Sequence, residues 1–477
     1  MRLLRTVPAA LILLTGLIIP GTAFAKDGCS SAGAADFNGD GLDDAVVADP
    51  FADVQGKEGA GVVHVLLGGG RSGVLVLQSP DAASGDGFGW SVRTAHVDGD
   101  RCLDVVVGAP YSDGEGSKDA GMAYVFHGTQ SGLPKVTRLL PERQPNAHFG
   151  WSLAAAESPT GGALVAVGEP HADSDGVSDS GAVHLFEVGD TAKASAIITQ
   201  ESEGVPGNGE IGDMYGWALA LGHIGGRPGD LDLAVGVPFE NDDGSGKQVA
   251  SGRADAGAVG VVFDVQTARG RYSGTALGLQ GDQRSNGRFG YALDYAEWRG
   301  DGFLAASAPR AAGGSGIVEL FVRKGAGEVS PLETVQAESG DLGGWSLAFW
   351  NPKDSLSLAI GSRMTSVRDP GTSGVLRPLL SSGSVPLANA GAYVHVGAFM
   401  HDGTSVSDIG GRSAFEPGAG LLVGLPDAGP AGSVAVLGAD ASVSGGPGQI
   451  NEDAPAYRGP GRIDGGASAD FGAAVAG

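Results

Sequence analysis

Two short motifs alternate along the chain, and this repetition restricts its fold more than any other feature. The first motif is an aromatic residue, a glycine and a small apolar run, found at Phe88-Gly89, Phe149-Gly150, Tyr215-Gly216 and Phe289-Gly290. The second motif is β-rich and ends in proline, found at Gly108-Ala109-Pro110, Gly168-Glu169-Pro170, Gly236-Val237-Pro238 and Ser307-Ala308-Pro309. A regular internal period of this kind predicts a repeat architecture.

The remaining copies indicate how the repeats close. Two eroded pairs follow the four clear ones: Gly343-Gly344-Trp345 with Gly361-Ser362-Arg363, and Ala390-Gly391 with Gly424-Leu425-Pro426. One unpaired half is left near each end of the chain, Ala48-Asp49-Pro50 and Phe471-Gly472. We therefore expect a closed ring of seven units, in which the C-terminal strand pairs with the N-terminal unit.

Each unit is expected to be a small β-sheet. The apolar segments are short, rich in β-branched residues and bounded by turn formers, as in 45–47, 61–67, 73–77 and 105–107. Three strands are recognisable in each repeat and a weaker fourth follows, which is typical of a propeller blade. We predict an all-β, seven-bladed β-propeller. Phe88 and Trp90, with their equivalents, are expected to wedge between adjacent blades as core residues.

These motifs resemble the FG-GAP repeats of integrin α-subunits and of secreted bacterial proteins. The resemblance covers nearly the whole chain after residue 25. It implies a seven-bladed β-propeller with calcium loops in some of its blades.

A nine-residue acidic loop is the best candidate for a metal site. Asp36, Asn38, Asp40 and Asp44 place oxygen atoms at positions 1, 3, 5 and 9, and the Leu42 carbonyl would add a ligand at position 7. Alternating oxygen donors suit Ca²⁺, which takes six to eight such ligands. The alternative is a metal-free Asp/Asn/Gly turn. A degraded copy of the loop predicts a weaker site at Asp98, Asp100 and Asp104, where His96 and Arg101 replace the first carboxylate and the turn glycine.

Cys29 and Cys102 are the only cysteines, so a secreted chain permits one disulfide between them. The alternative is two isolated thiols. The bond would need Cα atoms within ~7 Å, which is easier if residues 471–476, rather than 30–35, supply the first strand of the N-terminal blade.

The N-terminus has the features of a secretory signal peptide over residues 1–25. Arg2 and Arg5 precede an apolar run over 9–19, and Ala23-Phe24-Ala25 fits a cleavage site. The alternative is a membrane anchor, but the run is shorter than the ~20 residues that a span needs. We expect an extracellular protein whose residues 26–477 form one propeller with no membrane span.

Charge and missing motifs limit the function. The net charge of −25 argues against nucleic acid as a partner. The sequence contains no Gly-x-Ser-x-Gly elbow, no His-Glu-x-x-His motif and no Walker loop. The first hypothesis is a monomeric, non-catalytic, calcium-binding module for adhesion to an extracellular protein or glycan. The alternatives are an extracellular carbohydrate-active or phosphodiester-cleaving enzyme and a calcium-dependent lectin-like binder.

Overall fold

The structure is a computed structural model of the chain. It describes residues 29, 35–41, 44–67, 73–113, 116–130, 134–140, 144–159, 161–241, 253–268, 270–279, 286–336, 343–350 and 356–362, and the later strands at 374–378, 385–386, 405–408, 421–425, 433–437, 448–450 and 474–476. The predicted signal peptide, Leu42, Ala390-Gly391 and Phe471-Gly472 lie outside the described residues.

The described strands form seven four-stranded antiparallel sheets. The first contains, from one edge to the other, β28 (Ala474–Ala476), β1 (Ala45–Asp49), β2 (Val62–Leu67) and β3 (Gly73–Leu77). The second contains β4 (Ser91–Ala95), β5 (Asp104–Ala109), β6 (Met122–His127) and β7 (Lys135–Leu139). The third contains β8 (Ser152–Glu157), β9 (Ala163–Glu169), β10 (Ala182–Val188) and β11 (Ala192–Ile198).

The other four sheets repeat this order. They contain β12 (Ala218–Gly222), β13 (Asp232–Val237), β14 (Ala258–Val262) and β15 (Gly274–Leu277); β16 (Leu293–Trp298), β17 (Asp301–Ala308), β18 (Ile317–Arg323) and β19 (Val329–Gln336); β20 (Gly343–Trp350), β21 (Ser357–Ser362), β22 (Gly374–Pro378) and β23 (Val385–Pro386); and β24 (Ser405–Asp408), β25 (Leu421–Leu425), β26 (Ser433–Leu437) and β27 (Gly448–Ile450). One helical turn, α1 (Ala311–Gly314), connects β17 to β18.

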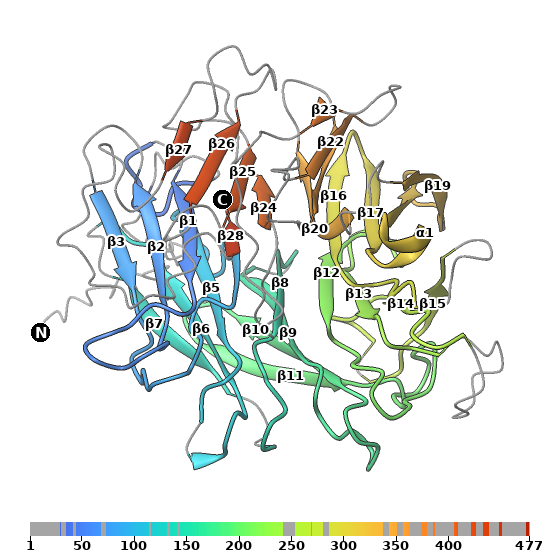
Figure 1. The fold of residues 1–477 in the computed structure, drawn as a ribbon, viewed down its shortest axis with the longest axis horizontal. Coiled ribbons are helices and arrows are strands. Elements are labelled where there is room, and N and C mark those ends of the chain that lie inside the picture. Colours follow the sequence, from blue (N-terminus) through green and yellow to red (C-terminus); the bar gives the residue numbers. More distant parts are fainter. Residues whose placement is uncertain are drawn as a thin grey trace, which may run out of the picture.

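Burial follows strand position within each sheet. In the first five sheets the second and third strands are almost entirely buried, and β5 and β6 are buried along their whole length, because neighbouring sheets cover both of their faces. The outer strands β7 and β11 are exposed or partly exposed along their length, and only their last residues are buried. The innermost strands β4, β8, β12, β16, β20 and β24 each contact the next, and β28 contacts both β24 and β4. Figure 1 shows the sheets arranged around the middle of the molecule, with β28 beside β24. This all-β arrangement fits a β-propeller.

The recurring motifs form the contact between adjacent sheets. The two motifs of one sheet are joined by a hydrogen bond from the Gly89 N–H to the Gly108 carbonyl, at 3.0 Å. A Cβ on Gly108 would lie 2.0 Å from the Gly150 carbonyl oxygen of the next sheet, and one on Gly121 would lie 2.1 Å from that of Phe149. Because backbone from the neighbouring sheet fills the space of a side chain, glycine is required at both positions.

The aromatic residues of the first motif have two different positions. Phe88, Phe149, Tyr215 and Phe289 are fully buried, each in a core cluster that draws strands from two adjacent sheets. Their predicted wedging is therefore confirmed. The tryptophans pack on one another instead, with ring centroids 5.0 Å apart for Trp90 and Trp151 and 4.9 Å apart for Trp151 and Trp217. The stack continues through Tyr291 to Trp345.

Candidate functional site

Asp36 organises the predicted calcium loop. Its Oδ1 accepts hydrogen bonds from the backbone N–H groups of Gly39 and Asp40, at 2.5 and 3.2 Å, and its Oδ2 accepts one from Gly41, at 2.6 Å. The Asn38 amide nitrogen donates to Asp40 Oδ2 at 3.4 Å. The side-chain oxygens of Asp36, Asn38 and Asp40 are thus held on one tight loop. Asp36 Oδ1 accepts two hydrogen bonds, whereas Asp36 Oδ2 accepts one from the loop backbone and keeps a second lone pair for a cation. The all-oxygen donor set fits Ca²⁺.

The aspartate at position 9 of each loop closes the loop. Asp44 Oδ2 accepts the N–H of Phe37 at 2.8 Å, and Asp104 Oδ2 accepts the N–H of Val97 at 2.6 Å. Asp232, in the fourth sheet, does the same for Ile224, at 2.8 Å, although its loop lacks the acidic pattern. This residue therefore has a structural role with or without a metal.

At the degraded second loop, the possible metal ligands that lie close together differ from the predicted ones. Asp98, Asp104 and His127 place ligand atoms within 4.8 Å of one another. His127 Nδ1 lies 3.5 Å from Asp98 Oδ2, whereas Asp100 Oδ1 accepts the Cys102 N–H at 2.8 Å and does not join the group. Burial, the largest cause, raises the pKa of Asp104 above its usual range. Metal binding at Asp98, Asp100 and Asp104 stays a prediction, and the imidazole makes this group less suited to Ca²⁺ than an all-oxygen loop.

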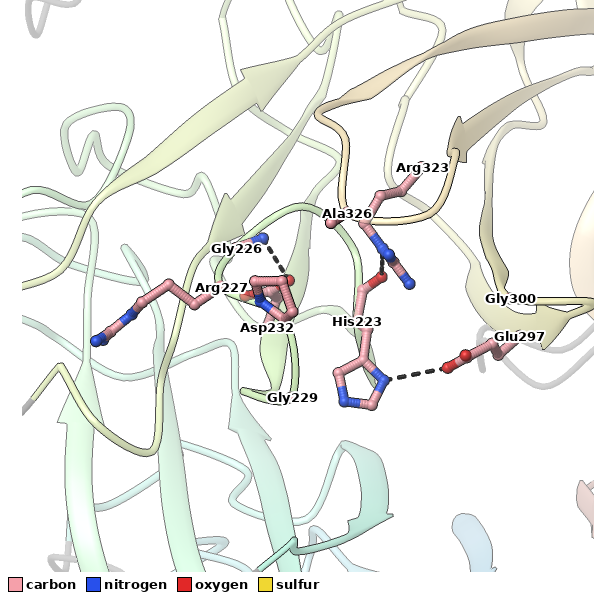
Figure 2. A pocket seen from close by; sticks show the side chains of 10 residues that line it. His223, Gly226, Arg227, Gly229, Asp232, Glu297, Gly300, Arg323 and Ala326 are labelled. Carbon is pink, nitrogen blue, oxygen red and sulfur yellow. Dashed lines mark hydrogen bonds and ion pairs between the residues drawn. The ribbon is translucent and has the colours of Figure 1, made fainter.

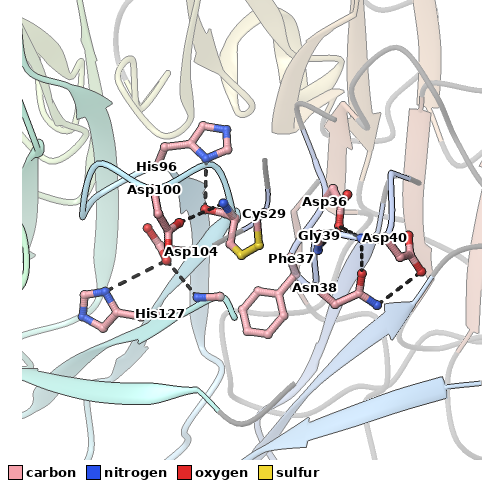
Figure 3. The surroundings of a disulfide bond; sticks show 12 residues. Cys29, Asp36, Phe37, Asn38, Gly39, Asp40, His96, Asp100, Asp104 and His127 are labelled. Atoms are coloured by element: carbon pink, nitrogen blue, oxygen red, sulfur yellow. Dashed lines mark hydrogen bonds and ion pairs between the residues drawn. A yellow bond between two sulfur atoms is a disulfide. The ribbon is translucent and has the colours of Figure 1, made fainter. Parts of the chain in front are cut away.

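The two acidic loops are joined directly (Figure 3). Cys29 and Cys102 form a disulfide with a Cα separation of 5.1 Å. The N–H of Leu103 donates to the Asp36 carbonyl at 2.9 Å. A Cβ on Gly39 would lie 2.6 Å from Cys29 Sγ, so the first loop packs against the bond itself.

A pocket of about 220 Å³ lies between the fourth and fifth sheets (Figure 2). The β12–β13 connection supplies His223, β13 supplies Asp232, and the neighbouring sheet supplies Glu297 and Arg323. His223 Nδ1 lies 3.1 Å from Glu297 Oε2, and both side chains are partly exposed, at 32% and 47%. This connection is the counterpart of the predicted calcium loop, with a histidine and an arginine in place of carboxylates.

The two arginines of the pocket differ in direction. Arg323 donates from Nε to the His223 carbonyl oxygen, which also accepts a hydrogen bond from the Tyr295 hydroxyl at 3.1 Å. Arg227 reaches away from His223 in Figure 2, and its guanidinium binds Asp264 and Thr267. The Arg323 guanidinium is therefore the cation that is fixed beside the histidine.

Sequence reasoning missed His127, His223 and Glu297. Each belongs to a different strand or sheet from its partner, so no local spacing marks the pair. For His223 and Glu297 the separation is 74 residues. The one local signal is the loss of the acidic pattern from the β12–β13 connection, which by itself indicates only an empty loop.

Comparison with known proteins identifies the repeats. The FG-GAP repeat family matches residues 30–66 and, through a second FG-GAP repeat model, residues 75–126. The chain carries FG-GAP repeats. This FG-GAP chain is similar to integrin alpha-PS2 of Drosophila melanogaster, with 34% identity over 119 residues, 23% of this chain and 8% of the integrin. The predicted integrin α-like repeat is confirmed.

Longer alignments connect the FG-GAP chain with enzymes. It is 29% identical over 205 residues to phosphatidylinositol-glycan-specific phospholipase D of Homo sapiens, covering 39% of this chain and 23% of that protein. The Dictyostelium discoideum enzyme of the same name is 24% identical over 235 residues, covering 44% and 24%. The chain thus spans about a quarter of each of these relatives.

These relatives correct the functional expectation. A non-catalytic adhesion module is the first hypothesis from the sequence, because no catalytic motif stands in it. The phospholipase relatives contradict that hypothesis and favour the phosphodiester-cleaving alternative. Among the described residues, no helix has the length and apolar character of a membrane span.

Proposed function

We propose that the chain is an extracellular phosphodiester-cleaving FG-GAP protein that acts on phosphatidylinositol-glycans, with His223 and Glu297 in its active site. The relatives' names supply the reaction class. The observation that carries the assignment to this chain is the partly exposed His223–Glu297 pair beside a fixed guanidinium. A carboxylate-oriented imidazole is a common general base, and a guanidinium stabilises developing phosphoryl charge.

Each residue has a defined role in the proposed reaction. Glu297 accepts the Nδ1–H of His223, which leaves Nε2 to take a proton from water. The water oxygen bonds to phosphorus, and the P–O bond to the inositol-glycan breaks. The imidazolium returns its proton to the departing inositol oxygen, so the products are phosphatidate and the free glycan alcohol. Arg323 holds the His223 backbone and contributes positive charge beside it.

The test is hydrolysis of a purified phosphatidylinositol-glycan in detergent, and the released phosphatidate is the quantity measured. His223→Asn and Glu297→Gln should each lower kcat/KM, the former by about 10²–10⁴-fold, the contribution of a general base. The matched control is His171→Asn, because His171 also pairs with a carboxylate, at 3.2 Å from Asp179, but lies outside the pocket. The proposal fails if the wild-type chain releases no phosphatidate, or if His223→Asn behaves like the control.

We also propose that the seven sheets are the blades of a closed ring, and that β28 completes the N-terminal blade. The antiparallel pairing of Val475 with Val47 and the contacts of β28 with β24 and β4 support this closure. Residues 26–477 would then form one propeller. Residues 1–25 would be removed on secretion.

We further propose that the Asp36 loop binds one Ca²⁺. The loop's oxygen donors and its packing on the disulfide support a stabilising role. EDTA should lower the melting temperature of the wild type. Asp40→Ala should bind one calcium ion fewer, and EDTA should lower its melting temperature by less. Equal calcium stoichiometry in the wild type and Asp40→Ala, measured by equilibrium dialysis, would contradict the proposal.

A further inference from the structure

A second group of carboxylates lies far from the acidic loops in the sequence. Glu210, Asp213 and Glu240 place ligand oxygens within 4.8 Å of one another. Glu210 and Asp213 belong to the connection from β11 to β12, and Glu240 follows the proline motif after β13. Glu210 is 5% exposed and Asp213 is fully buried. Three carboxylates this close repel one another strongly where water is excluded, unless a cation or protons neutralise them.

The same turn in the second sheet shows which of these residues the fold requires. Asp213 Oδ2 accepts the Glu210 N–H at 2.6 Å, and Asp86 Oδ2 accepts the Ala83 N–H at 2.7 Å. Both aspartates stand two residues before the aromatic residue of the first motif. The aspartate is therefore part of the turn. Ala83 occupies the position of Glu210 in the second sheet, so the turn does not need a carboxylate there. The Glu210 side chain is therefore not explained by the fold of the turn.

Two buried oxygen atoms at the group have no hydrogen-bond partner among the described residues. They are Asp213 Oδ1 and Gln200 Oε1. The Gln200 amide lies against the group, because its Nε2 donates to Glu240 Oε2 at 2.9 Å, and Gln200 is only 5% exposed. An unpaired buried oxygen is unfavourable, because burial removes its hydrogen bonds with water and nothing replaces them. Both atoms would be satisfied by the same ligand, a cation.

We propose that Glu210, Asp213, Glu240 and Gln200 bind a divalent calcium-class cation, separate from the Asp36 loop. The donors are oxygen atoms throughout, three of them from carboxylates, which suits a hard cation and leaves room for water ligands. The ion neutralises all three carboxylates, of which Glu210 and Asp213 are buried and Glu240 is partly exposed. It also ties the inter-blade connection to the turn after β13, beside Tyr215 and Trp217 of the aromatic-glycine motif.

The experiment uses the full chain and the metal alone. Tb³⁺, which replaces Ca²⁺ at oxygen sites, is titrated with excitation of the protein's tryptophans, and Ca²⁺ stoichiometry is measured by equilibrium dialysis. Asp213→Asn keeps an acceptor oxygen for the turn but removes the charge. It should weaken one Ca²⁺ site at least tenfold, while the site that Asp40→Ala removes should remain.

Asp86→Asn is the matched control, since it makes the same change in a turn where Ala83 takes the place of Glu210 and no group of three close carboxylates is found among the described residues. Its calcium stoichiometry should equal that of the wild type. Glu240→Gln is a second variant, with the same expected loss, for use if Asp213→Asn fails to fold. Melting gives an independent readout: in EDTA, Asp213→Asn should be as stable as the wild type or more so, and in Ca²⁺ it should be less stable.

The inference is overturned if both Asp213→Asn and Glu240→Gln bind as many calcium ions as Asp86→Asn. Neither result depends on phosphodiester cleavage, so this inference and the proposed function can fail separately.

Discussion

At the scale of single residues, one aspartate recurs with the same structural task in loops of different chemistry. Asp104 accepts one N–H from its own loop and Asp232 accepts three, and each accepts another from just after the third strand, at Gly128 and Asp264 respectively. Asp44 accepts an N–H of its own loop in the first sheet. A carboxylate in this place satisfies backbone donors that the turn would otherwise leave buried. An acidic residue at position 9 is therefore poor evidence of a metal.

Burial of His64 predicts a pH effect on stability. Its side chain lies in β2, between Val47 and Val76 on the paired strands, and burial lowers the pKa of His64 to about 4. The unfolded chain has the ordinary value of 6.5 and binds more protons between pH 6.5 and 4. The free energy of unfolding should therefore fall as the pH is lowered through this range, by about 3 kcal/mol in total.

The measurement is denaturant unfolding from pH 7.5 to 4.5 for the wild type and His64→Leu. The substitution should remove this contribution, so that the difference in unfolding free energy between the two proteins grows towards low pH. A constant difference over the whole range would show that His64 is not held neutral by burial.

At the scale of elements, the blade contact depends on glycines that no other residue can replace. Gly121 has a φ of 87°, and a Cβ there would lie 2.1 Å from the Phe149 carbonyl oxygen. We expect Gly121→Ala to lower the unfolding free energy by about 3 kcal/mol or more, from left-handed strain and the displaced strand together.

Gly116→Ala is the control for this substitution. Gly116 has a similar φ of 91°, but a Cβ there meets nothing within 4 Å. The unfolding free energy of Gly116→Ala should fall only by the cost of the left-handed backbone conformation, about 1–2 kcal/mol. Equal losses for the two variants, in chemical unfolding, would show that the contact with the next sheet adds nothing.

The disulfide predicts a loss of stability on reduction. The bond spans 73 residues of sequence, and closing a loop of that size restricts the unfolded chain by about 4 kcal/mol in the entropic account. The double variant Cys29→Ser, Cys102→Ser should unfold at lower denaturant by that order. It should also bind calcium more weakly at the Asp36 loop, which packs on the bond. Unchanged stability on reduction would mean that the two loops are held by their other contacts.

At the scale of the whole molecule, closure of the ring is the proposal with the largest consequence. Deletion of residues 471–477 removes β28, the strand that pairs with β1 and contacts β4. We expect a large cooperative loss of stability, because β1 then becomes an unpaired edge strand and the inner strands β24 and β4 lose a packed neighbour. Removal of Gly477 alone, which lies outside β28, is the control. A truncated protein as stable as the wild type would contradict the closure.

The fold is largely predictable because its signal is local and repeated. Strands at 45–47, 61–67, 73–77 and 105–107 are expected from β-branched runs between turn residues, and they match β1, β2, β3 and β5 closely. The stacking of Trp90, Trp151 and Trp217 is not predicted. Repetition shows that equivalent residues occupy equivalent places, but not whether they face a neighbouring sheet or one another.

The candidate sites also differ in whether the sequence alone could predict them. The sequence by itself determined the repeat, the β class and the Asp36 loop, since those depend on residues that are neighbours in the chain. Only the tertiary structure brought His223 to Glu297, His127 to Asp98, and Glu240 to Asp213. Each of these pairs joins residues from separate strands or connections, and the packing of four-stranded sheets decides which ones meet. Motif spacing describes separation along the sequence, whereas binding of an ion or a substrate requires side chains that are close in space.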